Sequence, residues 1–135
     1  MVLSWHKNRS ILSLMATMFH VLVIDDDLNL RDSMRRNLLR LGCNVTVADT
    51  AEGGMDFLKT DKYDAVFAAL CVRDMGGRSI ARWVKNQMTD TKFFIITSWK
   101  GDLEPNLLKL DGIHDVIHKP VNFCEVRDKV LEHLG

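Results

Sequence analysis

The sequence lacks the features that mark several large classes of protein. Its 18 basic and 18 acidic residues cancel, so no excess charge draws it to nucleic acid or to an anionic membrane. Three cysteines with no CxxC pair argue against both a disulfide framework and a zinc site. No run approaches the roughly 20 apolar residues of a membrane helix, and there are no repeats. The 135 residues therefore predict one cytoplasmic domain with reduced thiols and with neither nucleic acid nor membrane as a partner.

Residues 1–17 stand apart from this domain. Lys7 and Arg9 precede a short apolar patch, but no small-residue cleavage site follows it, so the segment does not read as a signal peptide. We interpret residues 1–17 as an N-terminal extension and residues 18–135 as the domain. An upstream mis-start and an expression remnant are the alternatives for the extension.

The remainder of the chain alternates between strand and helix patterns. Apolar, β-rich runs alternate with segments whose apolar residues recur at helical spacing. The predicted strands are residues 19–24, 44–48, 64–69, 92–97 and 113–117. The predicted helices are one that ends at Gly42, then 51–59, 79–88 and 102–110, and a last one with Phe123, Val126, Val130 and Leu134 inward. Short connections predict an α/β fold, a doubly wound (βα)₅ unit with a parallel sheet between two helical layers.

Polar side chains gather where the predicted strands end. Asp25, Asp26 and Asp27 follow the first strand, Thr97 ends the fourth, and Lys119 follows the fifth. These groups meet in one crevice, because the carboxyl ends of parallel strands share one edge. A carboxylate pair suits Mg²⁺, while a hydroxyl and an ammonium suit phosphoryl oxygens. The sequence thus predicts a phosphoryl-and-metal pocket, in which Asp27 also fits the simpler role of a helix N-cap.

Five stretches carry a resemblance to a known family. They are VLVIDDD at 21–27, YDAVFAAL at 63–70, Met75 and Gly77 in the next loop, IITS at 95–98, and GIHDVIHKPV at 112–121. Over residues 19–134 the sequence resembles the receiver domain of response regulators, the phosphoacceptor module of two-component signalling. The resemblance implies a flavodoxin-like fold of strand order 2-1-3-4-5, a cis Lys119–Pro120 bond and a signalling role without enzyme activity.

The resemblance also assigns roles within the crevice. The acceptor aspartate of the family maps to Ala69, its hydroxyl residue to Thr97 and its lysine to Lys119. In the family the acid pair and a backbone carbonyl two residues after the acceptor hold Mg²⁺. The corresponding groups here are Asp25, Asp26 and the carbonyl of Cys71.

The sequence departs from the family at the positions that carry out or transmit the phosphorylation. Ala69 has no nucleophilic oxygen, so no acyl phosphate forms there. The loop proline is replaced by Arg73, the small residue after the hydroxyl is Ser98, and the aromatic residue of the fifth strand is Val116. An engineered replacement of aspartate by alanine at position 69 would explain only the first change. We therefore favour a natural degenerate receiver, or pseudo-receiver.

The missing carboxylate has two expected consequences. The Mg²⁺ site is weak, because one of three anions is absent and two unit charges about 4 Å apart interact by roughly 4 kcal/mol at an effective dielectric near 20. Lys119 loses its partner at position 69, so we expect it to turn toward Asp25 or Asp26 and to replace the metal in part.

The favoured function is a receiver-like signalling module of a two-component phosphorelay that is not phosphorylated at Ala69 and acts through protein contacts. Its expected partner is a histidine kinase or a downstream regulator, and a homodimer is possible through the fourth helix, fifth strand and fifth helix. Trp99 is a candidate anchor there, with a fold-back over its own loop as the alternative. Trp83 is expected to pack in the core.

Two other functions stay open. The domain could accept a phosphoryl group on another carboxylate, with Asp74, Asp25 or Asp26 as the residues available. The D-x-D of Asp25 and Asp27 also resembles haloacid-dehalogenase-type phosphatases, but no further acid pair follows the last strand and the chain has no room for a cap domain.

Overall fold

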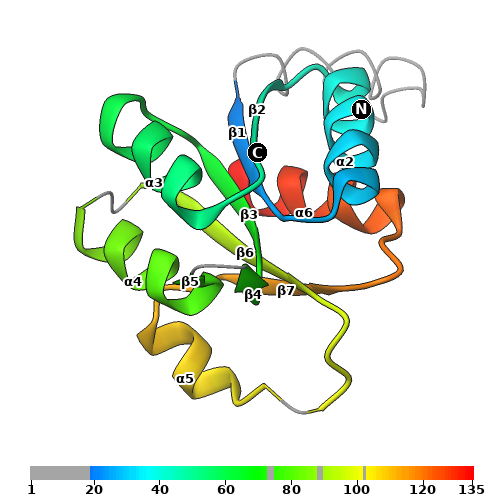
Figure 1. Cartoon of the computed structure of the whole chain (residues 1–135). Coiled ribbons are helices and arrows are strands. Elements are labelled where there is room, and N and C mark those ends of the chain that lie inside the picture. The colour runs from blue at the N-terminus through cyan, green and yellow to red at the C-terminus, as the bar shows by residue number, and fades with distance from the viewer. Residues whose placement is uncertain (1–18, 73–74, 88–89, 102) are drawn as a thin grey trace, which may run out of the picture.

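A parallel sheet of five strands forms the middle layer of the fold, and helices cover both of its faces (Figure 1). The structure, a computed structural model, describes residues 19–72, 75–87, 90–101 and 103–135, without the side chain of Leu107. The strands are β1 (His20–Ile24), β2 (Asn44–Ala48), β3 (Ala65–Ala69), β6 (Lys92–Thr97) and β7 (Asp115–His118). Their order, β2-β1-β3-β6-β7, is the flavodoxin-like order 2-1-3-4-5 that was predicted.

The five helices lie in two layers. They are α2 (Leu28–Leu41), α3 (Ala51–Thr60), α4 (Gly77–Gln87), α5 (Pro105–Leu110) and α6 (Phe123–Leu134). The helices α2 and α6 cover one face of the sheet, and α3 and α4 cover the other (Figure 1). Successive strand residues point to opposite faces, so both cores draw on each central strand. In β1, for example, Val21 and Val23 pack under α2 and α6, whereas Leu22 and Ile24 pack under α3.

The helix ends follow from local sequence. Asp27 is the N-cap of α2, as expected, since its side chain accepts a hydrogen bond from Leu30 N. Thr50 caps α3 in the same way through Gly53 N. Gly42 ends α2 with φ 102°, a left-handed conformation that glycine adopts without steric cost. The Lys119–Pro120 bond is cis, as predicted.

Several predicted boundaries were wrong. The helix α5 begins at Pro105, later than predicted, because the residue before a proline is disfavoured in helical conformation. The helix α4 begins at Gly77, two residues earlier than predicted. A two-stranded antiparallel ladder, β4 (Cys71–Val72) with β5 (Met75–Gly76), replaces part of the predicted loop. The strand β7 starts at Asp115 and extends to His118.

Some predictions fall on residues outside the described ranges. They concern the extension at 1–17, the loop residues Arg73 and Asp74, Met88 at the end of the helix predicted over 79–88, and position 102. Within the described ranges, no helix has the length and apolar character needed to cross a membrane.

Candidate functional site

Asp25 is the buried centre of the site. It follows β1 directly and is fully buried. Its amide donates to the carbonyl of Ala48 at 3.1 Å, and its Oδ1 accepts from the amide of Asp27 at 2.9 Å. The guanidinium of Arg31 donates to the carbonyl of Asp25 at 2.8 Å, a contact that the sequence patterns did not reveal. Backbone and helix cap together therefore fix this carboxylate, while Asp26 beside it is exposed to solvent.

Lys119 lies against this buried carboxylate. Its Nζ is 3.1 Å from Asp25 Oδ2, so the predicted ion pair is present and Asp25 is the partner. The geometry is that of a close charge contact, because Oδ2 is buried and accepts no well-aligned hydrogen bond. The Lys119 side chain is 27% exposed and keeps access to solvent. Among the described residues, the ion-pair partner of the Asp25 carboxylate is thus a partly exposed ammonium.

Ala69 is the last residue of β3 and is only 5% exposed. Its neighbour in the sheet is Ile96 of β6, one residue before Thr97. The Thr97 side chain accepts a hydrogen bond from the amide of Trp99 at 2.9 Å, and its carbonyl accepts from the amide of Lys119 at 2.8 Å. A Cβ at Gly77 would collide with the carbonyl oxygen of Ala69, so the start of α4 approaches this strand end closely.

A hollow of about 390 Å³ opens beside these residues. It is lined by Ala69, Leu70, Cys71, Ile96, Thr97, Ser98, Trp99, Lys100 and Lys119. The structure thus brings the predicted residues at positions 69, 71, 97 and 119 to one place, at the carboxyl ends of β3 and β6. Both charged side chains of the lining are cations, and the methyl group of Ala69 supplies no ligand atom.

The donor set fits Mg²⁺ poorly. A hard divalent cation requires several oxygen ligands in near-octahedral geometry. The described residues contain no group of three His, Cys, Asp or Glu side chains placed to hold a metal ion. The available oxygens are those of Asp25 and Asp26 and the backbone carbonyl of Cys71, and Lys119 lies against one of them.

The two tryptophans of the described chain differ in exposure. Trp83 on α4 is half-buried and packs against the core, as predicted. Trp99 is 58% exposed. A Cβ at Gly101 would lie 2.5 Å from the indole nitrogen of Trp99, so the ring lies across its own loop. It keeps more than half of its surface free, beside the hollow.

Comparison with known proteins agrees with this architecture. The family model of the response regulator receiver domain matches residues 21–131. The response regulator MprA of Mycolicibacterium vanbaalenii is 28% identical over 101 residues, which cover 74% of this chain and 43% of that protein. Transcription factor SKN7 of Candida albicans is 26% identical over 119 residues, which cover 86% of this chain and 21% of that protein. The chain spans less than half the length of these two curated relatives.

Solved structures show the same fold. A CheY-like receiver domain protein from Methanospirillum hungatei superposes with a TM-score of 0.81 at 23% identity, covering 86% of this chain and 93% of that one. The response regulator TrrA from Thermotoga maritima, in complex with Mg²⁺-BeF, superposes with a TM-score of 0.78 at 22% identity, covering 86% and 99%. With the family match spanning most of the sequence, the chain belongs to the response regulator receiver domain family.

Proposed function

We propose that this chain is a degenerate receiver, a two-component signalling module that is not phosphorylated at position 69 and acts through protein contacts. The observation that carries the proposal is the methyl group of Ala69 at the end of β3, beside Thr97 and Lys119. Formation of an acyl phosphate requires a carboxylate nucleophile. Alanine has none.

The remaining pocket groups have partners of their own. Lys119 is paired with Asp25, and the Thr97 hydroxyl oxygen accepts a hydrogen bond from the amide of Trp99. A phosphoryl group would have to compete with these contacts. An Mg²⁺ ion would be held by Asp25, Asp26 and the carbonyl of Cys71 and would supply charge neutralisation for phosphoryl oxygens. We propose that it binds weakly, because Lys119 competes for Asp25.

The proposed output surface consists of α5, β7 and α6, the counterparts of the fourth helix, fifth strand and fifth helix of the family. Trp99 precedes α5, and Leu110 at its end is 66% exposed. Tryptophan is enriched among the residues that anchor protein interfaces, so Trp99 is the candidate anchor of this surface. A histidine kinase, a downstream regulator or a second copy of the chain is the proposed partner.

Incubation with acetyl phosphate and Mg²⁺, followed by intact mass spectrometry, tests the proposal. The expected spectrum is that of the unmodified chain. Addition of one phosphoryl group would support the alternative function, with a carboxylate such as Asp25 or Asp26 as the acceptor. Peptide mapping would then identify the acceptor residue.

A further inference from the structure

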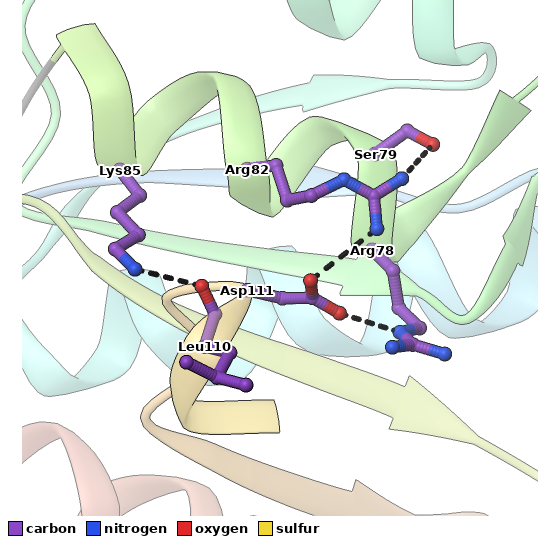
Figure 2. A network of polar contacts seen from close by, with 6 residues as sticks. All are labelled: Arg78, Ser79, Arg82, Lys85, Leu110 and Asp111. Atoms are coloured by element: carbon purple, nitrogen blue, oxygen red, sulfur yellow. Dashed lines mark hydrogen bonds and ion pairs between the residues drawn. The ribbon is translucent and has the colours of Figure 1, made fainter. Parts of the chain in front are cut away.

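Asp111 is a buried carboxylate in the turn that joins α5 to β7, and two arginines of α4 hold it (Figure 2). Arg78 Nε lies 2.6 Å from one carboxylate oxygen, and Arg82 Nη1 lies 3.3 Å from the other. Asp111 is 7% exposed. Arginine binds carboxylates well because its planar fork presents several donors. The contact joins two elements that are distant in the sequence.

A third basic residue of α4 extends this contact. Lys85 Nζ donates to the carbonyl of Leu110, the last residue of α5, at 2.7 Å (Figure 2). Gly112 has φ 81°, and a Cβ there would lie 2.8 Å from the Cβ of Lys85. Glycine therefore permits both the turn and the close approach of α4. At positions 78, 82 and 85, the three basic side chains recur at helical spacing and reach the same turn.

Among its described side chains, the helix α5 has few other attachments. It is six residues long, too short to be stable on its own. Among the α5 side chains that the structure describes, only Leu108 packs against the core, while Pro105, Asn106, Lys109 and Leu110 are exposed. The polar contacts with α4 are thus a large part of what holds the end of this helix.

We propose that Arg78, Arg82 and Lys85 form a clamp on Asp111 and Leu110 that holds α5 in one position whatever the state of the pocket at Ala69. The clamp would give a receiver without an acceptor a permanently presented output surface. Its relevance to signalling rests on the proposed function, because α5 belongs to the proposed output surface. The clamp itself does not depend on that function.

The charges of the clamp keep it closed near neutral pH. Burial alone would raise the pKa of Asp111, but hydrogen bonds and charge from Arg78 and Arg82 outweigh it and hold this pKa below the ordinary value. Asp111 therefore remains ionised at physiological pH. The clamp is a fixed device and not a pH-sensitive one.

Hydrogen exchange of the full chain tests the clamp. In Asp111→Asn, we expect the amides of α5 and of its following turn to exchange about tenfold faster or more, while those of α2 and α3 keep their rates. The matched control is Lys129→Gln, which removes a 2.6 Å ion pair to Asp115 between α6 and β7. That variant should leave the exchange of α5 unchanged. The variant Arg78→Lys, which keeps the charge, should restore part of the protection lost in Arg78→Gln.

Two results would overturn the proposal. One is unchanged exchange of α5 in Asp111→Asn, and the other is a uniform rise over the whole sheet, which indicates general destabilisation. Independence from the pocket is tested with Lys119→Met, which should leave the exchange of α5 as in the parent chain. None of these readouts involves phosphorylation, so failure of the clamp and failure of the proposed function are separable.

Discussion

At the scale of single residues, the ion pair between Lys119 and Asp25 dominates the electrostatics beside Ala69. The ammonium of Lys119 forms an ion pair with the carboxylate of Asp25, and Asp25 is fully buried. A buried anion without a compensating charge is costly. The ammonium of Lys119 therefore stabilises the folded state by compensating this buried charge.

Replacement of Lys119 by methionine tests this role. We expect Lys119→Met to lower the free energy of unfolding by about 1–3 kcal/mol, since Asp25 loses its counter-charge and the lysine is partly exposed. Urea denaturation at neutral pH measures the change. Lys100→Met is the matched control, because Lys100 lines the same hollow but forms no ion pair with any described residue. Equal stability of the two variants would contradict the assigned role.

The Lys119→Met variant also tests whether Lys119 competes with Mg²⁺ for Asp25. Without Lys119, Asp25 Oδ2 becomes free for a cation, so millimolar Mg²⁺ should stabilise Lys119→Met more than it stabilises the parent chain. Denaturation curves with and without Mg²⁺ show the difference. An equal or larger Mg²⁺ effect on the parent chain would mean that Lys119 and the metal do not compete.

Sequence patterns predicted this residue-level pairing because a lysine deprived of one carboxylate turns to the next nearest. They did not decide between Asp25 and Asp26. The structure favours Asp25, whose backbone contacts and helix cap fix it within the core, over the exposed Asp26. The conformation of Trp99 was likewise undecided, since it depends on the path of a short loop over Gly101.

At the scale of elements, β7 and α6 are joined by an acidic residue that responds to pH. Burial alone would raise the pKa of Asp115, but hydrogen bonds from Lys129 Nζ and Val116 N, together with the charge of Lys129, hold this pKa below its usual 3.8. The unfolded chain therefore takes up a proton before the folded chain does. The stability from this contact is present above pH 3.8 and is lost as pH falls through the lower folded value.

Asp115→Asn should accordingly make the free energy of unfolding depend less on pH in the acid range. The parent chain should lose more unfolding free energy than the variant when the pH is lowered from about 5 to 3. Thermal unfolding followed by circular dichroism at several pH values measures both. Parallel curves for the two proteins would show that Asp115 has the same proton affinity in both states.

His114, just before β7, should make the stability of the fold depend on pH nearer neutrality. Burial, followed by the charges of Lys92 and His133, lowers its pKa from 6.5, and its Nδ1 accepts a hydrogen bond from the amide of Phe93 at 3.0 Å. Its contribution to stability is present above pH 6.5 and is lost as pH falls below it. His114→Asn keeps an acceptor oxygen but does not titrate. It should lose less stability between pH 7.5 and 5.5 than the parent chain in urea denaturation, and an equal loss would refute the assignment.

At the scale of the whole molecule, most of the architecture followed from sequence. Buried apolar runs and helical stripes predicted five strands, five helices and the edge of the sheet where the site lies. The β4–β5 ladder was not predicted, because two-residue strands are too short to show a hydrophobic periodicity. The contacts of Asp111 with α4 were not predicted either. In the sequence, Asp111 looks like an ordinary exposed aspartate. No sequence pattern links it to the arginines that bind it, which lie 29 and 33 positions away.

On the proposed function, the domain is not phosphorylated because position 69 carries no carboxylate nucleophile. Intact mass spectrometry of the parent chain and of Ala69→Asp, after the same incubation with acetyl phosphate and Mg²⁺, tests it most directly. We expect one added phosphoryl group on Ala69→Asp and none on the parent chain. Phosphorylation of the parent chain would contradict it.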